Sequence, residues 1–329
     1  MNEKTLLNLH LQLRVTSESD SNNSEELLLV NGLTCYQNKD YVKAISFFSK
    51  AYELNPKNKD YLYWKKICLY DSELSSSGQD DPDLQNLKGS LLLKLESYED
   101  AIECFLRAIS LDPNISLYYF NNANALNHLE KFNQANLFFD RAIQLDPFNS
   151  LYLYSKEINL IENQLKVKPD DHELINSKGC FFLKLKEFAK AEIEFEKAIN
   201  LDSDKADYHY HRGIALSELG QVEKAHRCFE TAKALNSNKN DFCIYQQINM
   251  INWHMKSNPG DAELFNRKGK LLFKLTDYAT AVRCFSKAIK LDPSKHEYYS
   301  QKGNTLEIMD RKEESLKYFT KAKELYSRR

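Results

Sequence analysis

Apolar and small residues recur along the chain in the spacing Ala-x3-Phe-x2-Ala, and several copies continue with x4-Pro. This self-similarity predicts a repeat architecture, and it decides the fold before any single element is considered. A small residue, Gly or Ala, lies twelve residues before the first alanine of each copy. The copies begin at Ala44, Ala101, Ala135, Ala191, Ala225, Ala281 and, with serine in the first place, Ser315.

These columns resemble the tetratricopeptide repeat (TPR), a 34-residue helix–turn–helix unit. Its small residues at positions 8, 20 and 27, its aromatic residue at 24 and its proline near 32 match them. The resemblance implies an all-α, right-handed α-solenoid of hairpins, each made of a helix A and a helix B. Small residues at positions 8 and 20 let the two helices approach closely, and the ring at 24 fills the gap between repeats. Position 8 is occupied by Gly32, Gly89, Ala123, Gly179, Gly213, Gly269 and Gly303.

The register divides the chain into repeats, a lead-in and three extra segments. The lead-in is 1–24, the extra segments are 59–81, 150–171 and 240–261, and the repeats are 25–58, 82–115, 116–149, 172–205, 206–239, 262–295 and 296–329. Gly89, Gly179 and Gly269 are 90 residues apart, so two repeats and one extra segment form a larger repeating unit.

Each extra segment carries apolar residues at alternating steps of three and four, which predicts an amphipathic helix. The extra helices therefore lie singly between repeat pairs. We expect Ile158 and Ile161, and likewise Ile248 and Ile251, to be buried against the preceding helix B. Either the extra helix caps each pair of repeats, or the superhelix absorbs it and continues.

Composition narrows the classes of partner. The 45 Lys and Arg residues nearly balance the 47 Asp and Glu residues, for a net charge of -2, and this disfavours nucleic acid. No apolar stretch approaches the roughly 20 residues of a membrane span, and the N-terminus does not resemble a signal peptide. Seven scattered cysteines without a C-x-x-C pair indicate a reducing compartment, so we expect a cytoplasmic protein and no membrane partner.

A search for chemistry finds no catalytic motif. Six of the nine glycines occupy position 8, so no glycine-rich phosphate loop remains, and no zinc or hydrolase signature is present. Cys180 has no assignable partner as a nucleophile, and His209 and His211 point to different helix faces. We expect a protein that is not an enzyme and that has no cofactor and no metal site.

Positions 5, 9 and 13 of helix A form one stripe, because successive steps of four residues differ by about 40°. Asparagine amides there suit a peptide backbone, and lysines suit carboxylates. Asparagine ladders in related TPR superhelices suggest the same role. The candidate peptide-binding residues are Asn86, Lys94, Asn176, Lys184, Asn266, Lys270 and Lys274, with Ser90 and Cys180 between them. Alternatively, duplication of the 90-residue unit alone would repeat any surface residue.

The sequence thus predicts a non-catalytic scaffold that binds other proteins, through an extended acidic segment or a helix. A carboxylate clamp for chaperone peptides is disfavoured, because position 2 is acidic at Glu173, Asp207, Glu263 and Glu297. One alternative is a structural subunit of a large cytoskeletal or ciliary assembly, contacting through the convex face and extra helices. A third, less favoured class is an RNA-binding helical repeat. The oligomeric state is left open.

Overall fold

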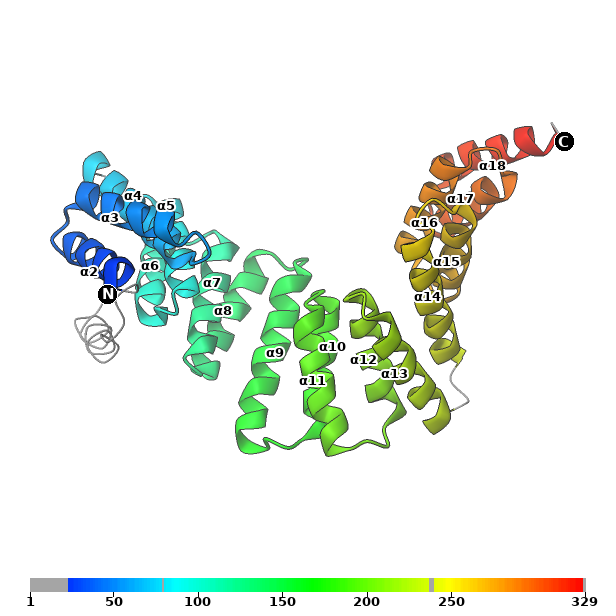
Figure 1. Cartoon of the computed structure of the whole chain (residues 1–329), viewed down its shortest axis with the longest axis horizontal. Helices are drawn as coiled ribbons and strands as arrows, with labels where there is room; N and C mark the ends of the chain where they lie inside the picture. The colour runs from blue at the N-terminus through cyan, green and yellow to red at the C-terminus, as the bar shows by residue number, and fades with distance from the viewer. Residues whose placement is uncertain (1–22, 79, 237–239, 328–329) are drawn as a thin grey trace. The chain divides into compact units, whose positions relative to one another are not determined.

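The chain is an all-α helical-repeat solenoid in the computed structural model, which describes residues 23–78, 80–236 and 240–327 (Figure 1). Within these residues there are 17 helices and no strand. The expected lead-in lies outside the described part up to residue 22, and the first helix begins at Asn23. The chain divides into two compact units, residues 1–167 and 168–329.

In the first unit, each helix packs against the next along the chain. The turns between them are short, so neighbours form the hairpins that the repeat pattern predicts. Its helices are α2 (Asn23–Gln37), α3 (Tyr41–Leu54), α4 (Asp60–Ser77), α5 (Pro82–Lys94), α6 (Tyr98–Leu111), α7 (Ser116–His128), α8 (Phe132–Leu145) and α9 (Ser150–Val167).

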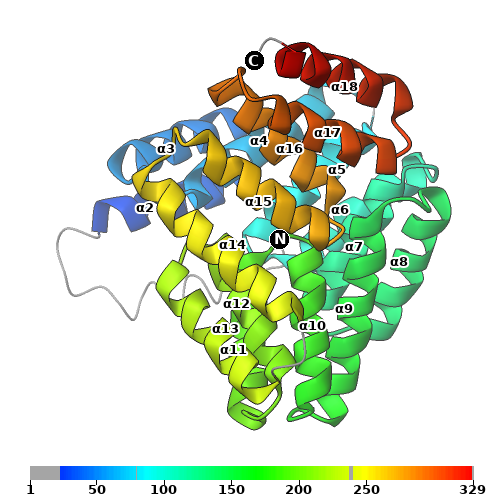
Figure 2. The ribbon, with the colours of Figure 1, turned by 90° about the vertical axis from the view of Figure 1, so that its right-hand side faces the viewer.

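The second unit is built in the same way, and α14, α15 and α17 follow one another in Figure 2. Its helices are α10 (His172–Lys184), α11 (Phe188–Leu201), α12 (Ala206–Glu218), α13 (Val222–Leu235), α14 (Asn240–Ser257), α15 (Ala262–Lys274), α16 (Tyr278–Leu291), α17 (His296–Ile308) and α18 (Lys312–Ser327).

The turn between helix A and helix B requires a left-handed residue in every expected repeat. Gly220 has a φ of 73°, and its amide and that of Gln221 bond the carbonyls of Ser217 and Leu216. These two bonds satisfy the last carbonyls of α12. In the other repeats the left-handed residue has a side chain, with φ between 56° and 61°: Lys39, Glu96, Glu130, Lys186, Thr276 and Asp310.

In six of the seven expected repeats, helix A and helix B meet where a glycine faces a phenylalanine ring. A Cβ placed on Gly179 would lie 2.5 Å from Phe195 Cε1, and one on Gly89 would lie 2.6 Å from Phe105 Cε1. The rings themselves are fully buried. The close packing expected for positions 8 and 24 is therefore present within each hairpin that has glycine there.

The three extra helices are folded and packed. Ile158 and Ile161 of α9 are 6% and 7% exposed, and Ile248 and Ile251 of α14 are 5% and 4% exposed. The burial expected for these four residues is confirmed. Buried amides fasten the same helices to helix B, because Asn159 Nδ2 donates to the Phe132 carbonyl at 3.0 Å. Asn249 makes the matching bond to the Val222 carbonyl at 2.9 Å.

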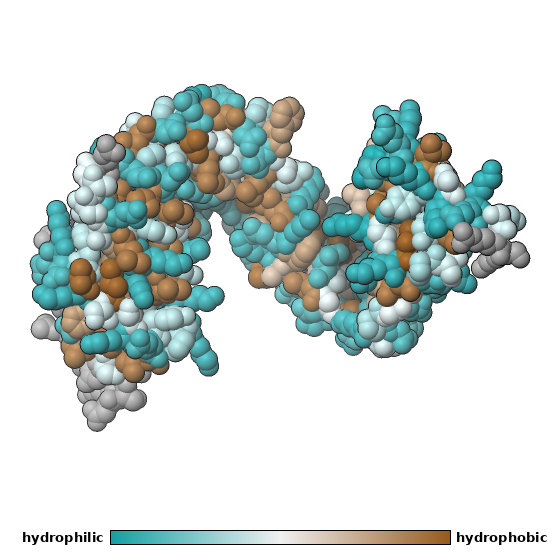
Figure 3. Space-filling view, turned by 90° about the horizontal axis from the view of Figure 1, so that it is seen from above, coloured by the Kyte–Doolittle hydropathy of each residue, from teal (hydrophilic) through white to brown (hydrophobic). Residues whose placement is uncertain are grey.

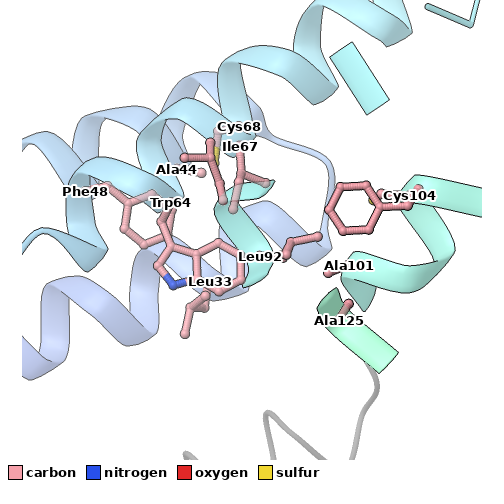
Figure 4. Packing of buried hydrophobic residues seen from close by; sticks show 12 residues of the cluster. Leu33, Ala44, Phe48, Trp64, Ile67, Cys68, Leu92, Ala101, Cys104 and Ala125 are labelled. Atoms are coloured by element: carbon pink, nitrogen blue, oxygen red, sulfur yellow. The ribbon is translucent and has the colours of Figure 1, made fainter. Parts of the chain in front are cut away.

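The extra helix α4 contacts helices on both of its sides. Tyr36 of α2 donates to Asp71 Oδ2 at 2.6 Å, and Lys88 of α5 donates to Asp71 Oδ1 at 2.7 Å. One buried cluster runs from α2 to α7 through this helix, with Trp64 between Phe48 and Leu92 (Figure 4). Within the first unit, α4 thus joins the repeat before it to the repeats after it.

Candidate functional site

Successive A helices are linked by side-chain bonds between residues 35 positions apart. Tyr118 donates to Asp83 Oδ1 at 2.6 Å, and Asn121 Nδ2 donates to Asn86 Oδ1 at 2.8 Å. A bond of the same spacing links a helix A to an extra helix, since Asn127 of α7 donates to Glu162 of α9 at 2.8 Å.

The three candidate asparagines are not equally accessible. Asn86 is 6% exposed and Asn266 is fully buried, so neither is the exposed amide that the stripe geometry led us to expect. Asn266 Nδ2 contacts both carboxylate oxygens of Glu263 at 3.3 Å. Asn176 is half-buried, and its Oδ1 lies 3.1 Å from Nδ1 of His211. These amides contact the chain itself, and two of the three are closed to solvent.

The candidate lysines at position 13 are exposed at the C-terminal ends of their helices. Lys94 Nζ lies 5.4 Å from the centre of the Tyr63 ring, and Lys184 Nζ lies 5.0 Å from that of Phe181. Lys274 is likewise exposed. Lys270, at position 9, forms an ion pair with Glu297 of the next helix A, and this partner lowers the pKa of the Glu297 carboxyl.

A pocket of about 460 Å³ opens in the second unit where α10, α12 and the end of α13 meet. Three carboxylates line it, from Glu173, Asp204 and Asp207, against one ammonium group from Lys205. The remaining wall is formed by Asn176, Ser177, Ala206, Tyr208, His211, Leu235 and Asn236. The pocket is therefore polar and predominantly acidic. Asn176 is the candidate residue from the sequence that lies in it.

The electrostatics of the pocket follow from burial and from the surrounding acids. Burial, followed by the nearby Glu173 and Asp202 carboxylates, raises the pKa of Tyr208 to about 12. Burial also raises the pKa of the adjacent Cys180 thiol to about 11, although Lys184 opposes the shift. A thiol with this pKa stays protonated near neutral pH, and it is a poor nucleophile.

Apart from Asn176, the residues that line this pocket were not among the candidates from the sequence, and neither was His172, which contacts one of them. His172 Nδ1 lies 2.7 Å from the Tyr208 hydroxyl, whereas the corresponding tyrosines elsewhere bond the acid at position 2. Those bonds run from Tyr118 to Asp83 and from Tyr298 to Glu263. The signal in the sequence was a histidine at position 1 of this repeat, immediately before Glu173.

Two kinds of site are not found in the described part of the chain. Within it, no three His, Cys, Asp or Glu side chains converge closely enough to hold a metal ion. None of the described helices combines the length and the apolar character that crossing a membrane requires.

Tetratricopeptide repeat models match six segments, which together make up more than half of the sequence. The matched segments are 26–58, 82–115, 172–205, 206–239, 262–295 and 296–328. The chain belongs to the tetratricopeptide repeat family. TPR proteins generally mediate protein–protein interactions, and TPR repeats are typically non-catalytic scaffolds.

This TPR chain spans between 13% and 54% of the length of the curated relatives that follow. It is 41% identical to the protein STIP1 homolog of Dictyostelium discoideum over 71 residues, which cover 22% of the chain and 13% of that protein. It is 24% identical to RNA polymerase II-associated protein 3 of Xenopus laevis, over 73% of the chain and 36% of that protein. Human DnaJ homolog subfamily C member 7 is 22% identical over 84% of the chain and 54% of its own length.

Solved TPR structures are similar to this chain at low sequence identity and low TM-score. YrrB, described as a TPR protein with an unusual peptide-binding site, is 20% identical, with 68% of this chain and 93% of that chain covered and a TM-score of 0.21. The TPR domain of P58(IPK) is 15% identical, with 91% and 92% covered and a TM-score of 0.29.

Proposed function

We propose that this TPR protein is a non-catalytic scaffold that binds extended segments of partner proteins along the helix-A surface within its units. The observation that carries the proposal is the 460 Å³ polar pocket between two successive A helices, α10 and α12. Convergent amide, hydroxyl and carboxylate groups in one hollow are typical of a surface that fixes a ligand's orientation.

The exposed lysines at position 13 supply the second part of the proposal. Lys94, Lys184 and Lys274 are exposed at the ends of their helices, and each can approach a carboxylate of an acidic partner segment. Solvent surrounds these contacts, so each contributes modestly and salt weakens it. The backbone of the segment would bond the half-buried Asn176 amide.

The test is a selection of random dodecapeptides displayed on phage, carried out on the full chain, with affinities then measured by fluorescence polarisation. Asn176→Ala/Lys184→Ala is expected to weaken the enriched peptides by about 1–3 kcal/mol. Lys224→Ala, at an exposed position of the helix B α13, is the control and should leave affinity unchanged. Melting curves check that the variants fold, and Lys184→Ala alone keeps the test valid if Asn176→Ala destabilises the chain. Unchanged affinity in Lys184→Ala and in the double variant would contradict this surface.

A second candidate function is a structural subunit that contacts its assembly through the extra helices. It is favoured by Met250 and Trp253, neighbours on α14 that are 36% and 46% exposed. Figure 3 shows that apolar residues also gather in patches among hydrophilic ones on the face turned to the viewer. Trp253→Ser should then abolish co-sedimentation with the native assembly while leaving peptide binding intact.

A further inference from the structure

We propose that the pocket between α10 and α12 receives an arginine or lysine side chain of the bound partner segment. The inference rests on the proposed function, because it names the chemistry that one part of the same surface recognises. The exposed lysines alone predict an acidic partner segment, and the pocket adds one positively charged residue to that segment.

The charge of the pocket favours a cation. Glu173, Asp204 and Asp207 contribute three carboxylates to the lining, and Lys205 is the ammonium group among the lining residues. The Tyr208 hydroxyl shares this field, since Glu173 is the leading charge that, after burial, raises its pKa to about 12. A negatively charged hollow attracts a cationic group and repels an anionic one.

The size of the pocket favours a side chain over a metal ion. Its volume of about 460 Å³ spreads the carboxylates around a cavity. In the described part of the chain no three acidic, histidine or cysteine groups converge on one point. The Asn176 side chain and the Ser177 hydroxyl line the same cavity, and they suit the several N–H donors of a guanidinium or ammonium group.

The first repeats of the three repeat pairs, 82–115, 172–205 and 262–295, differ in what contacts the acidic side chain at position 2. Asp83 accepts the hydroxyl of Tyr118, and Glu263 accepts that of Tyr298 and contacts the amide of Asn266. In repeat 172–205, His172 lies 2.7 Å from the Tyr208 hydroxyl and replaces the carboxylate as its partner. Glu173 therefore does not accept the tyrosine hydroxyl as Asp83 and Glu263 do. Its exposed carboxylate forms part of the pocket wall instead.

Duplication alone does not account for this difference. If duplication alone had set these contacts, the same tyrosine–carboxylate bond would recur in all three repeat pairs. Among the first repeats of the three pairs, position 1 is Pro82, His172 and Ala262, so the histidine beside the Tyr208 hydroxyl belongs to the pair that carries the pocket. Histidine also occupies position 1 of the last repeat, as His296. The structure therefore assigns recognition of the cation to the repeat pair 172–239.

The experiment uses the dodecapeptides enriched on the full chain and a synthetic version of each in which one basic residue is replaced by a neutral isostere. Citrulline replaces arginine, and norleucine replaces lysine. We expect arginine or lysine to be enriched at one position. The neutral version should bind the wild-type chain about tenfold more weakly, which is typical of a lost hydrogen bond to a charged group.

The matched variants are Glu173→Gln in the pocket and Glu223→Gln at an exposed position of α13, which change the net charge equally. The penalty for the neutral peptide should shrink in Glu173→Gln and stay at about tenfold in Glu223→Gln, as in a double-mutant cycle. Enriched peptides without a basic residue, or an equal penalty in both variants, would overturn the inference while leaving the scaffold function standing. A selection that enriches no peptide would contradict the scaffold function itself.

Discussion

Gly179 and Phe195 touch so closely that a Cβ on the glycine would lie 2.5 Å from Cε1 of the ring. The ring is fully buried, and it belongs to α11, which packs against the α10 helix of Gly179. Neither helix can retreat without opening the core of its own hairpin. The contact therefore sets the distance between helix A and helix B.

Gly179→Ala is expected to destabilise the chain by about 1–3 kcal/mol, because the added methyl group overpacks a rigid aromatic contact. The gain in helix propensity from glycine to alanine opposes this cost, but it is only about 1 kcal/mol. Urea denaturation followed by circular dichroism measures the difference. Gly260→Ala is the matched control, since no atom lies within 4 Å of its added Cβ. A Gly179→Ala chain as stable as wild type would mean that the ring yields.

Thr276→Gly should stabilise the chain by about 0.5–1 kcal/mol. Thr276 is exposed, it has a φ of 60°, and a branched side chain is costly in this left-handed conformation. Glycine removes the strain, although it also loses more entropy on folding. At the equivalent position of another hairpin, Gly220 is already a glycine with a positive φ.

The control for Thr276→Gly is the same substitution at Thr231, an exposed residue inside α13. There glycine should destabilise the chain by up to about 1 kcal/mol, because the backbone is helical. Thermal unfolding of the two variants should therefore shift in opposite directions. Shifts of the same sign would show that side-chain contacts, and not backbone conformation, dominate at Thr276.

The hairpin contacts could be predicted from the sequence, because they depend on spacing within one repeat. Small residues at position 8 and rings at position 24 imply the contact of Gly179 with Phe195. The steps of three and four likewise implied the burial of Ile158 and Ile161, which is confirmed. Each of these inferences requires only the helical period and the preference of apolar groups for the interior.

The surface between repeats could be predicted only in part. The helical period places Asn86, Asn176 and Asn266 at equivalent positions of their repeats, but it does not reveal how closely the next helix A covers them. Asn121 bonds Asn86 across that gap, and Asn266 is fully buried. The choice of partner for Tyr208, His172 instead of Glu173, depends on rotamers and on competing acceptors. A periodic pattern contains no information about either.

Alkaline pH should weaken the fold partly through its buried thiols. Burial raises the pKa of the Cys104 thiol from its ordinary value near 9 to about 11. Its protonated form is therefore favoured in the folded state, so this contribution to stability is fully present below pH 9 and is lost as the pH rises toward 11.

Removing that thiol should flatten the pH dependence. Between pH 9 and 10, Cys104→Ala should lose less unfolding free energy than wild type, by up to about 1.4 kcal/mol. Urea titrations at the two pH values measure this difference. Any cost of the smaller side chain is independent of pH and cancels. Equal slopes for the two proteins would contradict a raised pKa for Cys104.

Two buried asparagines should respond in opposite ways to the same apolar substitution. Asn122 of α7 is fully buried, and neither its Oδ1 nor its Nδ2 has a hydrogen-bond partner within the described residues. Asn159 of α9 is equally buried, but its Nδ2 donates to the Phe132 carbonyl at 3.0 Å and to Asn136 Oδ1 at 2.7 Å.

Leucine has the same branching as asparagine without the polar atoms, so Asn122→Leu removes two unsatisfied groups from the core. We expect it to stabilise the first unit by about 1–3 kcal/mol, the usual cost of burying such groups. Asn159→Leu should destabilise the same unit by a similar amount, since it leaves the Phe132 carbonyl and Asn136 without their donor. Urea denaturation of both variants at pH 7 measures the two changes. If Asn122→Leu loses stability as well, the two unsatisfied polar groups of Asn122 do not dominate its contribution, and the prediction is wrong.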